Sequence, residues 1–258
     1  MRRLGHSERK GISKLGLLIW GLVFVLAGIL SRSILQNGIL QMNTLSAEAL
    51  TEKLSASTAA MAVATVALVL QAAETCAIPV VAFLLVNGFE KAKSGKKLLL
   101  CLLIMAAASE IPYNLAMYGS FLHTATRSPA VALVIGLAVM YFFRRLSENS
   151  FANVLIKIFV GLSAVLWAAM LNVEHGLPLL VVIMVMWALR EKKSMGILFG
   201  GAVASGCVIF SPFYIGAALG ILPVYFYRTQ EEEKDVPLAV YAVYPAALAI
   251  LGLVSIFL

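Results

Sequence analysis

The chain has 258 residues, of which 61% are hydrophobic and 13% are charged, and its formal net charge is +7. Soluble domains are about half apolar and about a quarter charged, so this composition excludes an ordinary soluble globular fold. The basic residues lie in short clusters between apolar blocks, without a basic stripe interleaved with aromatic residues, and this pattern argues against a nucleic-acid partner.

Apolar segments recur along the whole chain, and many have the length that crosses a bilayer core as a helix. They predict an all-α, polytopic transmembrane bundle of about nine spans, organised as one integral-membrane domain over residues 1–258. The spans are expected at 14–35, 58–87, 98–119, 129–143, 154–173, 176–189, 195–210, 213–227 and 237–257. The basic N-terminal segment and the apolar run after it are interpreted as an uncleaved first span.

The distribution of Lys and Arg predicts a cytoplasmic N-terminus. With this orientation only Arg32, Lys53 and Arg127 of the 20 Lys and Arg lie on the outer side, as the positive-inside rule requires. The asymmetry holds only if residues 58–87 cross the bilayer once, so we expect this long span to be tilted or bent at Pro79. The acidic run 231–235 is expected to be a solvated turn.

Cysteine, histidine and glycine usage excludes several classes of site. The three cysteines lie in apolar segments and the three histidines are scattered, so neither a disulfide framework nor a metal site is expected. The chain also has no phosphate-binding glycine loop of the ATPase type.

Ionisable residues inside apolar spans are costly in a bilayer and are therefore candidate functional residues. Glu110 follows a long apolar run, and Asn114 and Tyr118 follow it at helical spacing, so the three share one helix face. Pro112 lacks a backbone N–H and leaves the carbonyl of Ala108 without its helical partner. This polar stripe is read either as a catalytic or binding site, or as a structural clamp between helices.

Two further polar groups are candidates. Glu74 lies in the second span near Pro79, and it is read either as a functional carboxylate or as a buried neutral acid. Glu174 and His175 sit in a tight turn signalled by Gly176 and Pro178, at the outer end of two spans. That pair is read either as an acid/base couple or as a hydrated turn.

The stretch at 78–120 resembles the TraX family, a group of polytopic bacterial membrane proteins whose founding member is linked to N-terminal acetylation of conjugative pilin. The resemblance is specific over about residues 75–120, and the turn at 174–176 and the Tyr-Pro element at 243–245 also resemble the family. The matching residues are Pro79, Phe83, Gly88, Phe89, Ser109, Glu110, Ile111, Pro112 and Leu115.

The chain departs from the family pattern at several polar positions. The early Asp-His pair is missing, and the family arginine before Phe-Pro falls at about Thr75. Asn87 and Asn114 stand where the family has acidic residues, and the histidine expected after Tyr-Pro is replaced near Ala247. These departures remove polar groups that an acyl transfer would use as base or oxyanion donor.

The resemblance implies acyl transfer from acetyl-CoA to a membrane or envelope acceptor such as pilin, in the bacterial inner membrane. The expected catalytic residues are Glu110, Glu74, Glu174 and His175. The expected substrate-binding residues are Asn114, Tyr118, Asn87, Lys96 and Lys97, the two lysines standing in a basic loop that would meet the CoA phosphates. Two alternatives stay open: a membrane scaffold that has lost the chemistry, and a small proton-coupled transporter.

Overall fold

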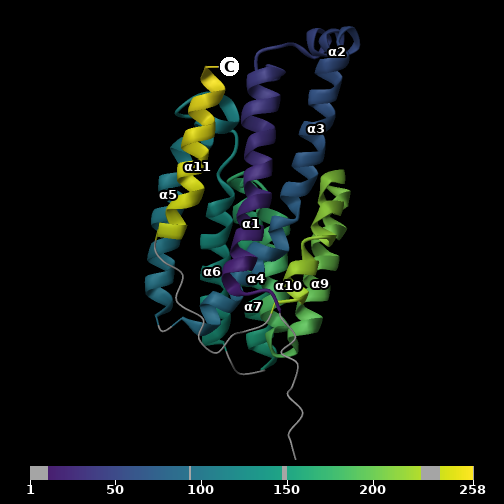
Figure 1. Ribbon diagram of the computed structural model, residues 1–258. Coiled ribbons are helices and arrows are strands. Elements are labelled where there is room, and N and C mark those ends of the chain that lie inside the picture. Colours follow the sequence, from purple (N-terminus) through teal and green to yellow (C-terminus); the bar gives the residue numbers. More distant parts are fainter. Residues whose placement is uncertain (1–10, 93, 147–149, 228–238, 258) are drawn as a thin grey trace, which may run out of the picture.

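A computed structural model describes residues 11–92, 94–146, 150–227 and 239–257 of the chain. Over these residues the protein is a bundle of helices (Figure 1), with isolated bridges as its only β contacts. The all-α prediction is therefore confirmed. The basic N-terminal segment and the acidic run 231–235, about which the sequence made predictions, lie outside the described residues.

The first half of the chain contains the longest helices. α1 (Lys14–Ile29) continues directly into the π-helix η1 (Leu30–Ile39), and α2 (Ala47–Ala56) follows at the far end of α1 (Figure 1). α3 (Thr58–Thr75) and α4 (Ala77–Lys91) return toward the start of α1, and α5 (Gly95–Tyr118) runs back again. Serine side chains cap the N-termini of α1, α2, α3 and α5, because their hydroxyls accept backbone N–H groups that the first turn leaves free.

The second half is built of helices of 20 residues or fewer. α6 (Pro129–Arg145), α7 (Phe151–Met170), α8 (Gly176–Ala188) and α9 (Lys193–Gly206) follow one another, with the short η2 (Arg190–Lys192) between the last two. The short helical pieces η3 (Cys207–Ile209), η4 (Pro212–Ala218) and α10 (Ile221–Tyr225) come next. α11 (Ala239–Ile256) packs along α5 (Figure 1).

Four helical segments are long and apolar enough to cross a membrane: Lys14–Ile39, Thr58–Lys91, Gly95–Tyr118 and Phe151–Met170. They identify a membrane protein. Other apolar helices are shorter, and α8 with 13 residues rises only about 20 Å along its axis. A helix of that length does not by itself span a hydrocarbon core of about 30 Å.

The long segment predicted at 58–87 has a break within it. α3 ends at Thr75, Cys76 forms a turn, and α4 begins at Ala77. Pro79 therefore lies in the first turn of α4, where its missing N–H breaks no helical hydrogen bond. The bend expected at Pro79 is located three residues earlier, and it places Glu74 on the last turn of α3.

Buried apolar side chains hold the bundle together around α4 and α8. Val80, Leu180 and Ile183 are completely buried in this core. A smaller cluster between α5 and α11 contains Tyr113 and Leu248. Many side chains of α7, such as Phe159, are instead exposed, as lipid-facing residues of a membrane helix are.

Candidate functional site

The site begins with the polar residues of η1. Hydrogen bonds of the π type, such as that from Leu40 N to Leu35 O (2.9 Å), give this helix a wider turn than an α-helix. Ser31 Oγ donates to Ala67 O of α3 (2.7 Å), and Ser33 Oγ donates to Leu251 O of α11 (2.9 Å). η1 is thus fixed to its neighbours on both sides of Arg32.

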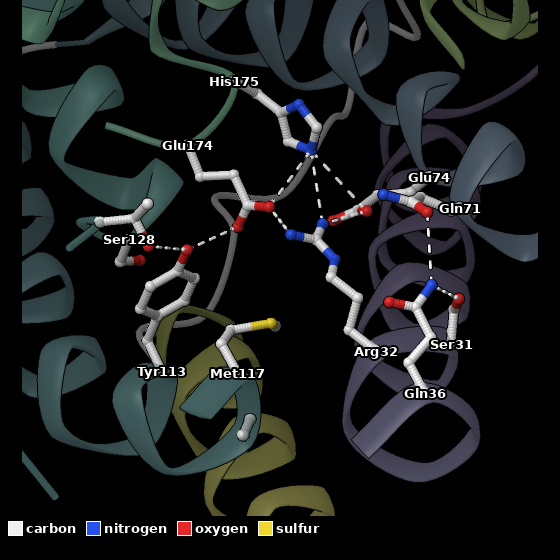
Figure 2. A network of polar contacts seen from close by, with 12 residues as sticks. Ser31, Arg32, Gln36, Gln71, Glu74, Tyr113, Met117, Ser128, Glu174 and His175 are labelled. Atoms are coloured by element: carbon white, nitrogen blue, oxygen red, sulfur yellow. Dashed lines mark hydrogen bonds and ion pairs between the residues drawn. The ribbon is translucent and has the colours of Figure 1, made fainter. Parts of the chain in front are cut away.

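Arg32 lies at the centre of a buried cluster of charges (Figure 2). Its guanidinium pairs with Glu74 of α3 and with Glu174 of the turn between α7 and α8. The side chains of Arg32, Glu74 and Glu174 are only 14%, 9% and 16% exposed. We call Arg32, Glu74, Glu174 and His175 the ion cluster. It joins three parts of the chain that are far apart in sequence.

His175 completes the ion cluster with an imidazole in contact on both ring nitrogens. Nδ1 lies 2.9 Å from the Tyr214 hydroxyl. Nε2 lies 3.5 Å from an Arg32 guanidinium nitrogen and 3.7 Å from Glu74 Oε2. The His175 backbone has φ +53°, a conformation unusual for a residue other than glycine, and such strain is characteristic of functional sites.

Backbone pairing holds the turn that carries Glu174 and His175. Arg127 N donates to Asn172 O (3.1 Å), and Glu174 N donates to Arg127 O (3.0 Å). The Tyr113 hydroxyl of α5 donates to Glu174 Oε2 (2.8 Å). The segment before α6, the turn before α8 and α5 therefore position the Glu174 carboxylate together.

The charges of the ion cluster favour a proton acceptor. With a neutral imidazole the cluster has two carboxylates and one guanidinium, an excess of one negative charge. A proton on His175 would balance these charges, and both carboxylates lie on the Nε2 side of the ring, 3.7 Å (Glu74) and 4.0 Å (Glu174) from that nitrogen. This arrangement is suited to general base catalysis.

The structure brings three of the four expected catalytic residues together and places Glu110 elsewhere. Glu110 Oε1 accepts the backbone N–H of Ser128 (3.1 Å), and its other oxygen is 3.7 Å from Arg127. Ser128 is the N-cap of α6, and its own hydroxyl accepts the N–H of Ala130 (3.3 Å). Glu110 thus satisfies a backbone N–H at the start of a helix.

The expected substrate-binding residues are spread over the bundle. Asn114 is buried, with an Oδ1 that has no hydrogen-bond partner among the described residues. The Tyr118 hydroxyl contacts Thr126, whereas Asn87 donates to the Tyr227 hydroxyl (3.2 Å) near the opposite end of the bundle. Lys96 and Lys97 are exposed in the first turn of α5.

Comparison with protein-family models gives a match to the family described as TraX protein, over residues 62–255. The chain belongs to the TraX family. Comparisons with curated proteins and with solved structures gave no match. The resemblance seen at 78–120 is confirmed, and it extends over most of the chain. The TraX match begins after η1, so Arg32 lies outside it while Glu74, Glu174 and His175 lie inside.

Sequence reasoning missed three members of this site: Arg32, Tyr113 and Tyr214. Arg32 was assigned to the outer side and used only to test topology. Its position between apolar residues in "GILSRSIL" was the available signal, because a charge inside an apolar span is a candidate functional residue. No comparable signal marks the two tyrosines, whose roles depend on contacts with distant segments.

Proposed function

We propose that this protein transfers an acyl group, acetyl from acetyl-CoA, to an amine or hydroxyl of a membrane or envelope acceptor such as pilin. Membership of the TraX family supports the reaction class. The observation that carries the proposal is His175, held at Nδ1 by Tyr214 and facing Glu74 with Nε2. A largely buried imidazole that is oriented through one nitrogen and lies near two carboxylates is suited to general base catalysis.

His175 acts as the base in the proposed reaction. When Nδ1 donates its proton to the Tyr214 oxygen, the lone pair of Nε2, which lies 3.5 Å from an Arg32 nitrogen, accepts a proton from the acceptor. The acceptor nitrogen or oxygen bonds to the thioester carbonyl carbon, the carbon–sulfur bond breaks, and His175 returns the proton to the leaving thiolate. Glu74 and Glu174 stabilise the imidazolium between these two proton transfers.

Arg32 supplies the positive charge that this chemistry needs. Its Nε is buried and has no hydrogen-bond partner among the described residues, although the rest of the guanidinium is paired. An N–H donor of this kind stabilises the negative charge that develops on a carbonyl oxygen during acyl transfer. Arg32 therefore takes the role of oxyanion donor, for which the family's polar residues are missing in this chain.

The proposed setting is the bacterial inner membrane, with about nine spans and a cytoplasmic N-terminus. Basic residues at the helix ends support this orientation. The first residues of α1 and α9 are Lys14 and Lys193, and the last residues of α4 and α6 are Lys91 and Arg145. With this orientation the ion cluster lies toward the outer leaflet, on the side where an envelope acceptor is present.

Lys96 and Lys97 are proposed to bind the phosphates of acetyl-CoA at the cytoplasmic end. The Arg32 guanidinium already pairs with two carboxylates, so the ion cluster is not a phosphate site. Lys97 and Tyr113 lie 16 positions apart on α5, or about 24 Å, so the donor must extend along the bundle to reach His175.

Replacing both lysines by alanine is expected to raise the KM for acetyl-CoA about tenfold with little change in kcat. Lys157→Ala on α7 is the control, and an equal change in KM there would contradict the assignment.

The proposed function is tested by transfer from labelled acetyl-CoA in membranes that contain the wild type, His175→Asn or Glu110→Gln at equal folded yield. Asparagine tolerates the positive φ of residue 175 but cannot act as a base. We expect His175→Asn to lose at least about a hundredfold in rate. We expect Glu110→Gln to keep most of it, because glutamine still accepts the Ser128 N–H.

A membrane scaffold is the second candidate, because the carboxylates of the ion cluster are already paired with Arg32. A scaffold has no transfer activity to lose. If the wild type transfers no label from any of several acyl donors, with native-host membranes as acceptor, the enzyme proposal is wrong and the scaffold remains. Loss of transfer in Glu110→Gln but not in His175→Asn would move the base to Glu110.

A further inference from the structure

A chain of hydroxyl groups leads away from Glu174 on the side opposite His175. The Tyr113 hydroxyl donates to Glu174 Oε2 (2.8 Å) and lies 3.0 Å from Thr126 Oγ1. Thr126 Oγ1 in turn contacts the Tyr118 hydroxyl. Tyr113 is 2% exposed, whereas Thr126 and Tyr118 are partly exposed. The chain therefore runs from the Glu174 carboxylate, which is 16% exposed, past the buried Tyr113 to two partly exposed hydroxyls.

The single proton on each hydroxyl fixes the direction of the hydrogen bonds in this chain. Each hydroxyl has a single proton. Tyr113 uses its proton on Glu174, so Thr126 must donate to Tyr113, and Tyr118 must then donate to Thr126. Three consecutive O–H groups point toward Glu174. A chain in which each member accepts one proton and passes on its own moves a proton without moving any heavy atom.

The outer end of the chain is next to a second titratable ring. The imidazole of His123 stacks on Tyr118, with ring centroids 3.8 Å apart and an interplanar angle of 12°. Both residues are partly exposed. The inner end faces Arg32 from η1 and His175 from the same turn, whose Nε2 is 4.0 Å from Glu174 Oε1. A titratable group thus flanks the hydroxyl chain at each end.

We propose that Tyr113, Thr126 and Tyr118 form a proton relay between Glu174 and the outer surface. Its catalytic use rests on the proposed acyl transfer. An α-amino acceptor has a pKa of about 7.7–8.0 and is largely protonated at neutral pH, so it must lose one proton before it attacks. That proton passes from the ammonium to His175 and then to Glu174. It leaves through the three hydroxyls once their O–H bonds have rotated to point away from Glu174, while the proton released on attack goes to the thiolate.

The relay is tested without donor or acceptor by infrared spectroscopy after a rapid change from neutral to acidic pH. The protonation rate of Glu174 is followed at the carboxyl band that Glu174→Gln removes. Tyr113→Phe and Thr126→Val are expected to slow this rate by about tenfold or more, because each removes one hydroxyl and keeps the side-chain shape. Thr126→Ser keeps the hydroxyl and Tyr214→Phe removes one from the His175 side, so both should protonate at the wild-type rate.

Each outcome decides the proposal. Wild-type rates in Tyr113→Phe and Thr126→Val overturn it, and so does equal slowing in Tyr214→Phe. If Tyr113→Phe fails to fold, the comparison of Thr126→Val with Thr126→Ser decides alone. The infrared rate does not require acyl transfer, so failure of the proposed function leaves this test intact. Where transfer is present, the Tyr113→Phe defect should be larger below the acceptor's α-amino pKa than above it.

Discussion

Replacement of Arg32 by alanine is expected to lower the free energy of unfolding by about 3–5 kcal/mol, the cost of removing one partner from a buried ion pair. The change leaves Glu74 and Glu174 facing each other without a counter-ion, and both carboxylates are largely buried. The effect is measured by chemical or thermal unfolding of the protein purified in detergent. Arg127→Ala is the matched control, because this side chain is 39% exposed and 3.7 Å from Glu110. That control is expected to cost less than about 1 kcal/mol.

Two further variants separate charge from geometry at Arg32. Arg32→Lys keeps the charge but loses the planar fork that reaches both carboxylates, so most of the destabilisation should remain. Arg32→Met combined with Glu74→Gln and Glu174→Gln removes every charge of the trio and should recover much of the lost stability. An Arg32→Ala protein as stable as the wild type would show that the pairing contributes nothing to the fold.

The membrane class and the helical architecture could be predicted because hydropathy and charge distribution are local properties of a sequence. Glu74, Glu174 and His175 were identified for a similar reason, since a polar residue within or beside an apolar span stands out without any knowledge of its neighbours. Helical spacing likewise placed Glu110, Asn114 and Tyr118 on α5 in a common stripe.

The assembly of the site could not be predicted, because periodicity assigns a residue to a helix face but not to a neighbouring helix. Glu110 and Tyr113 are one turn apart on α5, yet Glu110 caps α6 and Tyr113 contacts Glu174. The arginine of the family pattern is missing at Thr75. A guanidinium is present nevertheless, supplied by Arg32 from a π-helix that the sequence reading treated as the end of an ordinary span.

Hydropathy also did not predict where the helices end. The segments at 195–210 and 213–227 are each predicted as one continuous helix, but the first is divided between α9, with 14 residues, and η3, and the second between η4 and α10. Tertiary packing sets these ends. Gly201, for example, allows Ile221 of α10 to lie directly against α9. Apolar composition alone does not distinguish a crossing from a shorter buried helix.

Gly28→Ala is expected to destabilise the protein by about 3 kcal/mol, although alanine is the better helix former by up to about 1 kcal/mol. A Cβ at this position would lie 2.5 Å from Cγ of Glu74, and closer still to its carboxyl group. The glutamate side chain is flexible, so the steric contact itself is easily relieved. The cost arises because relief moves the carboxylate away from Arg32. Gly88→Ala on α4 is the control, since nothing lies within 4 Å of its added methyl group.

A double-mutant cycle with Glu74→Ala tests this cause. All three of the atoms nearest to the added methyl group belong to Glu74, so in the Glu74→Ala background the same Gly28→Ala change meets no carboxylate. We expect its sign to reverse there, with a gain of about 0.8–1.0 kcal/mol from helix propensity. Unfolding of the four detergent-purified proteins provides the cycle. Equal destabilisation by Gly28→Ala in both backgrounds would mean that the glycine is required by backbone packing and not by the ion cluster. A reversal would instead show that residue 28 of α1 is glycine so that the Glu74 carboxylate can pair with Arg32. Gly28 would then be required by the ion cluster, on which the proposed chemistry depends.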